Sequence, residues 1–490
     1  MRSHNLHIHN TLTRKKELFK PLKAPFVGMY VCGPTVYSDV HLGNCRTFMS
    51  FDVIYRYLLH LGYKVRYVRN ITDAGHLESD ADLGDDKIGK KAKLEQVEPM
   101  EIVQRYTVGF HDVMKAFNNL PPSIEPSATG HICEQIEMIK EIIRQGYAYE
   151  VDGTVYFDVE KYNLENNYGI LSGRKLEDML SNTRELGGQD EKKGKLDFAL
   201  WIKAKPEHLM KWLSPWGYGF PGWHIECSAM SSKYLGEQFD IHGGGMDLIA
   251  THHTNEIAQS KACHHTKPVN YWIHTNMLTV NGQRMGKSIG NAFLPEELFK
   301  GTHPLLDKGY SPMVVRFFML QTHYSSTLDF SNEALKASEK GYRRLMTAVK
   351  DMQSLSYSKT STSDISAWVE ACYSAMDDDF NTPILIAQLF EGARIINSVK
   401  GGTETITQPD AELLSSTLKA FISEVLGLAE ESDGSDHSAL DALMDIVLSL
   451  RAEAKTRKDY AASDRIRDLL NQHKFIVKDG KEGTTWAYQP

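Results

Sequence analysis

Apolar residues along the first part of the chain follow a strand period and then a helix period. The run from Val27 to Val31 is typical of a buried strand, and the turn-forming Gly33 and Pro34 end it. Helical spacing follows before Gly62, at Val53, Ile54, Tyr57, Leu58 and Leu61. A second apolar run from Val65 to Ile71 predicts another strand. The pattern therefore predicts a βαβ unit of a parallel sheet.

Ligands of such sheets bind beyond the carboxyl ends of the strands. Cys32, His41 and Thr72 follow the predicted strands, so we expect them at that edge. No GxGxxG sequence follows the first strand, which removes the main support for a dinucleotide site. A nucleotide bound at this edge would therefore need a different kind of site.

The rest of the chain changes character twice. Residues 128–201 contain strand-like pieces within Ala148 to Phe157 and a polar stretch from Ser181 to Lys195, which together indicate an insertion. Sheet-type motifs resume between Pro221 and Tyr271. Beyond Phe299 the pattern is mostly helical, with Ser-rich or acidic breaks that are typical of linkers. The chain ends with a helix-like stretch, 451–470, and an expected hairpin around Gly480 and Gly483.

Composition narrows the class of protein. The 490 residues, 41% apolar and 24% charged, indicate an ordinary globular protein of two to four domains. Apolar runs are too short to span a bilayer, and residues 1–23 lack the apolar core of a signal peptide, so we expect a cytoplasmic protein without membrane contact. Six cysteines without a repeated spacing favour free thiols or metal ligands. A net charge of −8 restricts any RNA contact to a local basic surface.

Two separate segments are candidates for a nucleotide site. His41-Leu42-Gly43-Asn44 lies where a loop meets a helix, so backbone N–H groups and the helix dipole favour an anion there. Arg284 to Asn291 forms a glycine-rich loop in which Lys287 can neutralise the charge of a departing pyrophosphate. A loop histidine bonded to its neighbours and a solvated basic turn are the respective alternatives.

Four residues form a candidate metal site. They are Cys32, Cys227, His252 and Glu256. The last two are four residues apart, so a helix presents both on one face, and thiolate, imidazole and carboxylate together suit zinc. Two buried cysteines beside a surface His/Glu pair are the alternative. The adjacent Cys263, His264 and His265 are a rival group, which we interpret as a loop cluster.

The two nucleotide-site segments resemble the HIGH and KMSKS signatures of class I aminoacyl-tRNA synthetases, in the same order. Asn44 replaces the final histidine of the first signature and keeps a hydrogen-bond donor. Arg284 replaces the first lysine of the second signature, and Gly286 replaces its first serine. The second lysine, Lys287, is present.

Further strings are similar to those of cysteinyl-tRNA synthetases, over Gly28 to Trp486. They are Met29 to Tyr37, Gly222 to Met230, His242 to Leu248, and His252 to Glu256, the last differing from the family only at Thr254. The resemblance implies one Zn²⁺ per chain, with Cys32, Cys227, His252 and Glu256 as its ligands. Zinc prefers a thiolate to a neutral hydroxyl, so a metal–sulfur bond separates cysteine from serine without an editing domain.

The resemblance also implies a reaction. L-cysteine attacks the α-phosphorus of ATP, which is bound with Mg²⁺, and is then transferred to the 3′ end of tRNA(Cys). The implied catalytic residues are His41, Asn44 and Lys287. The implied ATP-binding residues are His41, Gly43, Asn44, Arg284, Lys287 and Ser288. Thr72, Trp223 and Asp247 are expected to bind the amino acid; a core tryptophan and a helix-capping aspartate are the alternatives for the last two.

The implied fold is α/β: a Rossmann-type parallel-sheet catalytic domain with an insertion, then a helical bundle and a small C-terminal domain. We expect the catalytic domain at 1–127 and 206–299, the insertion at 128–205, a stem-contact region at 300–353, a helical tRNA-binding domain at 354–432 and an anticodon-recognition domain at 433–490. A monomer is expected. The acids of Met376 to Pro383 are interpreted as the first turn of a helix.

Basic residues are frequent near the C-terminus, at Arg451, Lys455, Arg457, Lys458, Arg465, Arg467, Lys474 and Lys478. Together with Trp486 they can contact phosphates and an unstacked base, although a solvated helix and a hairpin-packing tryptophan are the alternatives.

Three rival functions are a tRNA-independent cysteine ligase, a generic nucleotidyltransferase and a catalytically silent tRNA-binding protein. The long helical part argues against the first, the thiol-oriented metal set against the second, and Lys287 with the intact ligand set against the third.

Overall fold

The computed structural model describes residues 5–75, 86–181, 191–286, 289–431, 437–480 and 483–488. The chain divides into two compact units, Met1–Ala429 and Glu430–Pro490. Within the described residues, no helix is both long and apolar enough to cross a membrane.

A four-stranded parallel sheet forms the centre of the first unit. Its order is β11 (Val269–Thr275), β10 (Phe239–Gly245), β3 (Phe26–Val31) and β4 (Lys64–Arg69). Helix α1 (Leu42–His60) connects β3 to β4, and α8 (His252–His264) connects β10 to β11. The direction of chain crossover therefore reverses between β3 and β10, which is where open α/β sheets bind ligands. The parallel βαβ unit expected from the apolar pattern and the Rossmann-type core implied by the family resemblance are both confirmed.

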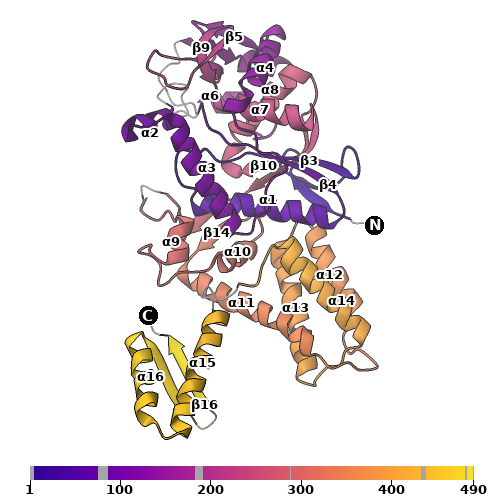
Figure 1. Ribbon diagram of the computed structural model, residues 1–490. Coiled ribbons are helices and arrows are strands. Elements are labelled where there is room, and N and C mark those ends of the chain that lie inside the picture. The colour runs from indigo at the N-terminus through magenta and orange to yellow at the C-terminus, as the bar shows by residue number, and fades with distance from the viewer. Residues whose placement is uncertain are drawn as a thin grey trace. The chain divides into compact units, whose positions relative to one another are not determined.

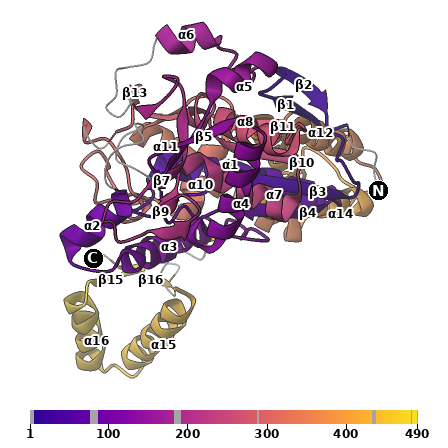
Figure 2. The ribbon, with the colours of Figure 1, turned by 90° about the horizontal axis from the view of Figure 1, so that it is seen from above.

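Alternating residues of β3 explain why helices cover both faces of this sheet. Met29 and Val31 belong to the large core that includes α1, whereas Tyr30 belongs to a core with Cys227 and Ile257, which lie on α7 (Trp223–Leu235) and α8. Figure 1 shows α1 on one face and α7 and α8 on the other. In Figure 2 the four strands lie side by side, in agreement with their pairing.

An antiparallel sheet with its own core begins within the expected insertion and extends beyond its end. Its order is β5 (Ala148–Val151), β6 (Thr154–Phe157), β7 (Phe198–Lys203), β9 (Gly217–Pro221) and β8 (Trp212–Ser214). Phe157 and Trp201 are buried in that core beside α4 (Ile132–Arg144). The last strand in sequence ends at Pro221, whereas the expected insertion ends at residue 205. Most of the polar stretch 181–195 lies outside the described residues.

The remaining elements of the first unit are shorter or mostly helical. Before the insertion they are β1 (His7–Asn10), β2 (Lys15–Leu18), α2 (Lys87–Glu95) and α3 (Pro99–Ala116). Within it they are η1 (Thr129–His131), α5 (Val159–Glu165) and α6 (Leu176–Ser181), and η3 (Met246–Leu248) follows β10. After the parallel sheet they are β12 (Leu278–Val280), β13 (Gln283–Arg284), α9 (Pro295–Lys300), α10 (Pro312–Leu320), β14 (Leu328–Phe330), α11 (Asn332–Asp351), η5 (Met352–Ser354), α12 (Ile365–Asp377), α13 (Thr382–Lys400), α14 (Gln408–Lys419) and the π-helix η6 (Ala420–Val425).

The acids Asp377, Asp378 and Asp379 end a helix instead of starting one, so their interpretation as a first helical turn was wrong. Helix α12 ends at Asp377, and Asn381 caps α13. Each acid has a partner outside its own helix: Tyr57 Oη donates to Asp377 at 2.6 Å, Lys16 pairs with Asp378, and the N–H of His9 donates to Asp379. The acids thus fasten the helical region to the N-terminal hairpin and to α1.

A buried ionic cluster makes a second connection between these parts. Arg316 of α10 is fully buried and donates to Asp52 of α1 at 2.5 Å and to the carbonyl of Leu426 at 2.7 Å. Arg56 donates to the same carboxylate and to the carbonyl of Glu424. The segment that leaves η6 is therefore held against α1 by side chains whose donors are largely satisfied.

The second unit contains two helices and a hairpin. These are α15 (His437–Thr456), α16 (Tyr460–Gln472), β15 (Phe475–Gly480) and β16 (Gly483–Tyr488). The prediction of a single helix over 451–470 was wrong, because Lys458 at φ +57° interrupts the helical backbone. The hairpin is confirmed. Arg451 is buried and so does not join the exposed basic residues such as Arg457 and Arg465.

We expect Arg316→Ala to lower the free energy of unfolding by about 3 to 5 kcal/mol, because it leaves the buried Asp52 charge with one cationic partner fewer. Arg343→Ala is the control, since this exposed arginine pairs with Glu339 on the surface and should change stability by less than about 1 kcal/mol. Urea denaturation of both variants measures the difference. Similar losses in the two variants would contradict the role of the cluster.

Candidate functional site

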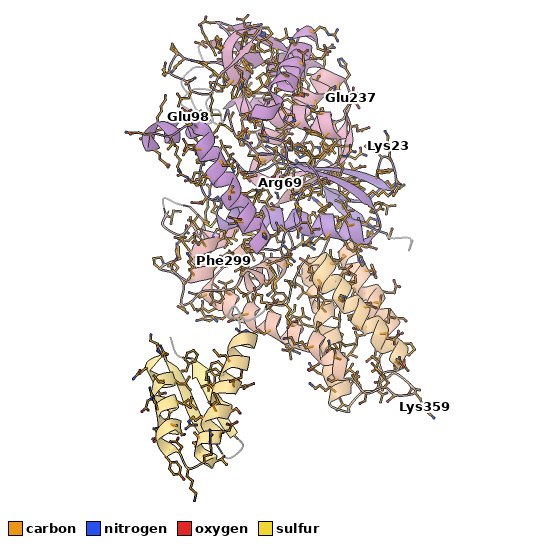
Figure 3. All side chains as sticks on the ribbon, in the orientation of Figure 1. Lys23, Arg69, Glu98, Glu237, Phe299 and Lys359 are labelled. Atoms are coloured by element: carbon orange, nitrogen blue, oxygen red, sulfur yellow. The ribbon has the colours of Figure 1, made fainter. Side chains whose placement is uncertain are left out.

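The residues singled out from the sequence gather at the carboxyl edge of the parallel sheet. Cys32 follows β3, Thr72 follows β4 and Asp247 follows β10. Figure 3 labels Arg69, the last residue of β4, in the middle of the first unit. Helix α7 brings Trp223 and Cys227 to this edge, and α8 brings His252 and Glu256.

Two thiols, an imidazole and a carboxylate converge here. The Sγ atoms of Cys32 and Cys227 are 3.7 Å apart, and Cys32 Sγ is 3.6 Å from Glu256 Oε1. His252 Nε2 lies 3.4 Å from Cys227 Sγ and 3.2 Å from Glu256 Oε1. Ligand atoms of a tetrahedral zinc site are roughly 3.3 to 3.8 Å from one another, given bonds of about 2.0 to 2.3 Å. These distances, in a buried group, fit a bound divalent metal ion.

A second set of groups overlaps the first, and consists of Cys32, His242, His253 and Glu256. His242 Nε2 donates to Glu256 Oε2 at 2.7 Å, a hydrogen-bond length that is short for two ligands of one ion. His253 Nδ1 is 2.7 Å from His274 Nε2. His242 and His253 are therefore better suited to orienting the metal ligands than to binding the ion, because hydrogen-bond partners of this kind hold metal-binding side chains in place.

Burial controls the protonation of these groups. It raises the pKa of the Cys32 and Cys227 thiols, and it lowers the pKa of His253 well below its ordinary value and that of His274 to about 3. A cation among the sulfur atoms favours their thiolate form, so metal binding here releases protons. Metal affinity must then fall as the pH falls.

The two nucleotide-site segments line one cleft of about 340 Å³. His41 caps the N-terminus of α1 and accepts from the N–H of Asn44, and both residues line the cleft opposite Met285 and Gly286. A side chain on Gly43 would come within 2.9 Å of Met285, so the backbone approaches closely there. Arg284 is an exposed residue of β13. Lys287 and Ser288 lie outside the described residues.

Arg46 and Asn291 hold the two segments that line this cleft, and sequence reasoning gave neither side chain a role. Buried Arg46, in the first turns of α1, donates to the carbonyls of Asn276, Met277, His323 and Ser326, and burial lowers its pKa to about 10. Asn291 accepts from the N–H of Gly286 and donates to the carbonyl of Arg284. The sequence did offer one sign of Arg46, because it is a charged residue among the apolar positions of the predicted helix.

The three residues expected to bind the amino acid have different surroundings. Thr72 is buried and bonded to Asn70 and Glu226, whose carboxyl pKa is raised by burial. Trp223 is half-buried, with its ring 4.5 Å from that of His252. Asp247 is exposed in η3, where its Oδ1 would be 2.3 Å from a side chain on Gly245.

Cys263 and His264 belong to the end of α8, and His265 is its left-handed cap, so these residues form a helix end and not the expected loop. Among the described residues, the groups that fit a metal ion include none of the three.

Comparison with known proteins identifies the family. Residues 18–340 match the model of the tRNA synthetases class I (C) catalytic domain, and residues 371–430 match the DALR domain. A cysteine–tRNA ligase of Porphyromonas gingivalis is 57% identical over 485 residues, which cover 99% of each chain. One from Chlorobaculum tepidum is 45% identical over 496 residues and 99% of each chain. The chain belongs to the cysteine–tRNA ligase family. It is thus an aminoacyl-tRNA synthetase, which ligates cysteine to tRNA.

Solved structures resemble the ligase in fold. The methionyl-tRNA synthetase of Mycobacterium tuberculosis in complex with methionyl-adenylate has a TM-score of 0.54 at 14% identity, over 82% of this chain and 89% of that one. The LeuRS–tRNA–LeuAMS ternary complex from Agrobacterium radiobacter has a TM-score of 0.57 at 11% identity, over 84% of each chain. At these identities the likeness concerns the class I synthetase fold alone.

We expect Cys227→Ala to remove bound metal from the ligase, because it deletes one of two thiols in the buried group. Cys133→Ala is the control, since Cys133 is exposed and outside the group. Elemental analysis of both proteins after dialysis against a chelator, over a pH series, measures the loss. Affinity should fall toward low pH as the thiols regain protons. Equal metal content in the two variants would contradict the site.

Proposed function

We propose that this cysteine–tRNA ligase catalyses its reaction in two steps, in the cleft and at the buried set Cys32, Cys227, His252 and Glu256, which we call the metal group. The carboxylate of cysteine attacks the α-phosphorus of ATP, pyrophosphate leaves, and cysteine then passes to the terminal ribose of tRNA(Cys). Positioning and electrostatic stabilisation supply the catalysis, so no covalent enzyme intermediate is required.

One observation carries this proposal. Cys32 belongs to the metal group, while Pro34 and Thr35, only a few residues further, line the nucleotide cleft. An amino acid whose sulfur binds at the metal group, beside Cys32, can therefore direct its carboxylate toward a nucleotide in the cleft. The hydrogen bonds of Thr72 N–H to the carbonyl of Pro34 and of Val36 N–H to that of Thr72 fix the segment between the two.

We propose Cys32, Cys227, His252 and Glu256 as the ligands of one zinc ion per chain. When bound, zinc provides a soft Lewis acid that accepts the thiolate of cysteine and discriminates against the hydroxyl of serine. His242 orients the Glu256 carboxylate by donating to its second oxygen. Trp223, beside His252, closes over the substrate, and Thr72 and Asp247 hold its polar groups.

Residues of the two signature segments bind ATP in this proposal. His41 and Asn44 donate to phosphate oxygens at the N-terminus of α1, and the absence of a side chain at Gly43 lets the nucleotide approach. Arg284 and Lys287 neutralise the triphosphate together with Mg²⁺, and Ser288 binds it through its hydroxyl group. Asn291 is bonded on both sides of Met285 and so limits the shapes that the described part of the loop adopts.

The helical and C-terminal parts are proposed to hold tRNA(Cys). The expected division assigns 128–205 to the insertion, 300–353 to stem contact, 354–432 to the helical tRNA-binding domain and 433–490 to anticodon recognition. Exposed basic side chains such as Arg457, in the turn before α16, and Arg465, on α16, support phosphate contacts in the second unit. Trp486 packs at 5.9 Å against Phe475, which supports a role within the hairpin. A monomeric state and a cytoplasmic location complete the proposal.

The function is tested by ATP–pyrophosphate exchange with each of the twenty amino acids. We expect exchange with cysteine and much less with serine, because zinc binds the thiolate more strongly. Lys287→Ala should lower the cysteine-dependent rate by about 10² to 10³, the usual cost of one stabilising contact in the transition state. Lys300→Ala, a surface lysine paired with Glu296, is the matched control. Comparable exchange with serine would refute the zinc-based selection.

Ending the chain at Ala429 separates activation from transfer. This truncation removes the second compact unit, so it should spare pyrophosphate exchange and impair charging of tRNA(Cys). Charging should also depend more steeply on salt than exchange does, because each phosphate contact releases counterions. Both activities are measured on both proteins over a salt series. Equal charging by the two proteins would show that residues 430–490 do not recognise tRNA.

A further inference from the structure

A second pocket, of about 280 Å³, opens at the amino edge of the parallel sheet, at the opposite end of the strands from the metal group. Its lining includes the first residues of three strands, which are Phe26 of β3, Lys64 of β4 and Phe239 of β10. Figure 3 labels Lys23, which also lines it, at the outer margin of the first unit, and Arg69, the last residue of β4, in the middle. The pocket is therefore distinct from the nucleotide cleft, with which it shares no lining residue among those described.

The register of the sheet explains why this pocket is open. Phe26 pairs with Lys64 across β3 and β4, and two residues further, on the same face, Gly28 pairs with Arg66. Helix α7 covers this face at Tyr30 but ends before it reaches these two pairs. A side chain on Gly28 would come within 3.3 Å of a side chain of β10 and 3.5 Å of one of α7. The lack of a side chain at Gly28 thus keeps the floor of the pocket open.

Three cations line the pocket and keep their charges available to a ligand. They are Lys23, Lys64 and Arg66, all exposed. Within the part of the chain that the structure describes, no carboxylate lies at ion-pair distance from any of them. The acid of the lining, Asp240, is buried, and its two oxygens accept from backbone N–H groups at 2.7 and 2.8 Å. The pocket therefore carries an excess of positive charge and favours an anion.

An aromatic ring lies among these cations. Phe26 is 57% exposed, and Lys64 Nζ is 5.5 Å from the centroid of its ring. Arg66 Nη1 donates to the carbonyl of Tyr234 at 3.1 Å, which holds the guanidinium group beside the pocket and uses one of its five N–H donors. A phosphate group accepts from several such donors at once, and a planar base stacks on an exposed phenyl ring. The volume is close to the lower end of the range for small-ligand sites, roughly 300 Å³, and so suits a single nucleotide.

We propose that this pocket binds a nucleoside monophosphate, with the phosphate between Lys64 and Arg66 and the base on the ring of Phe26. A nucleotide uses both features of the pocket, whereas an inorganic anion would use only the cations and an apolar ligand only the ring. The site lies at the other end of the strands from the nucleotide cleft. Its occupation therefore leaves that cleft accessible, and the two sites fill independently.

Equilibrium dialysis with radiolabelled AMP tests the site on the full-length, metal-containing protein. A non-hydrolysable analogue of cysteinyl-adenylate occupies the catalytic cleft, so AMP that stays bound reports a second site, of which we expect one per chain. Arg66→Ala should weaken this binding by roughly 10- to 100-fold, the range for hydrogen bonds to a charged group. Phe26→Ala should weaken it by roughly 5- to 100-fold, the range for stacking of one base. Lys300→Ala is the control, since this surface lysine lies outside the pocket.

Adenosine and inorganic phosphate separate the two halves of the ligand, in competition against AMP. Adenosine should lose affinity in Phe26→Ala and not in Arg66→Ala, and phosphate should show the reverse. Phe26→Tyr keeps an aromatic ring and should bind AMP as the wild type does. Cysteine-dependent pyrophosphate exchange should be unchanged in all these variants, which shows that they are folded.

Other results would overturn the proposal. A lack of AMP binding beside the analogue, or full binding in Arg66→Ala, would show that the cations only protect the exposed sheet edge from pairing with other chains. Phosphate that binds as tightly as AMP would make the pocket a simple anion site. A short single-stranded RNA that binds more tightly than AMP, and is lost in the same variants, would assign the pocket to an RNA strand instead.

Discussion

Parallel pairing of β10 with β3 places Ile241 beside Met29 and Gly243 beside Val31. This pairing joins the β3–α1–β4 unit to the β10–α8–β11 unit and creates the reversal of crossover at which ligands bind. Cys32 reaches the metal group because it follows β3, and His252 and Glu256 reach it because α8 follows β10. The nucleotide cleft depends on the same arrangement, since α1 begins at the same edge.

Buried polar groups at this edge are stabilised by one another. Isolated charges and unpaired imidazoles cost several kcal/mol in a protein interior. Here Glu256 accepts from His242, His253 contacts His274, and Asn70 and Thr72 are each bonded on more than one side. Such a network holds side chains in one arrangement. A metal ion among the sulfur atoms fits this environment because it favours the deprotonated thiols that burial alone disfavours.

Buried arginines connect the catalytic sheet to the helices that follow it. Arg46 binds carbonyls that precede β12 and follow α10, and so joins α1 to the strand leading into the second signature segment. Arg316 and Arg56 hold Asp52 and the carbonyls after α14. A guanidinium group suits these joints, because its several fixed donors satisfy several carbonyls at once. Helix α1, which begins in the first signature segment, is thus held in place by residues outside the cleft.

Local pattern alone was sufficient for the βαβ unit, the helical region and the terminal hairpin, because hydrophobic periodicity and turn residues act over short stretches of chain. Recognisable strings also identified the ligands and the two signatures as candidates. The role of Asp377 to Asp379 was misjudged, since their partners Lys16, Tyr57 and His9 are more than 300 residues away. The same limit applies to Arg46 and Glu226, whose partners are more than 100 residues away in the sequence. Their partners meet only when distant segments pack, so tertiary structure alone decided which polar groups are buried and what satisfies them.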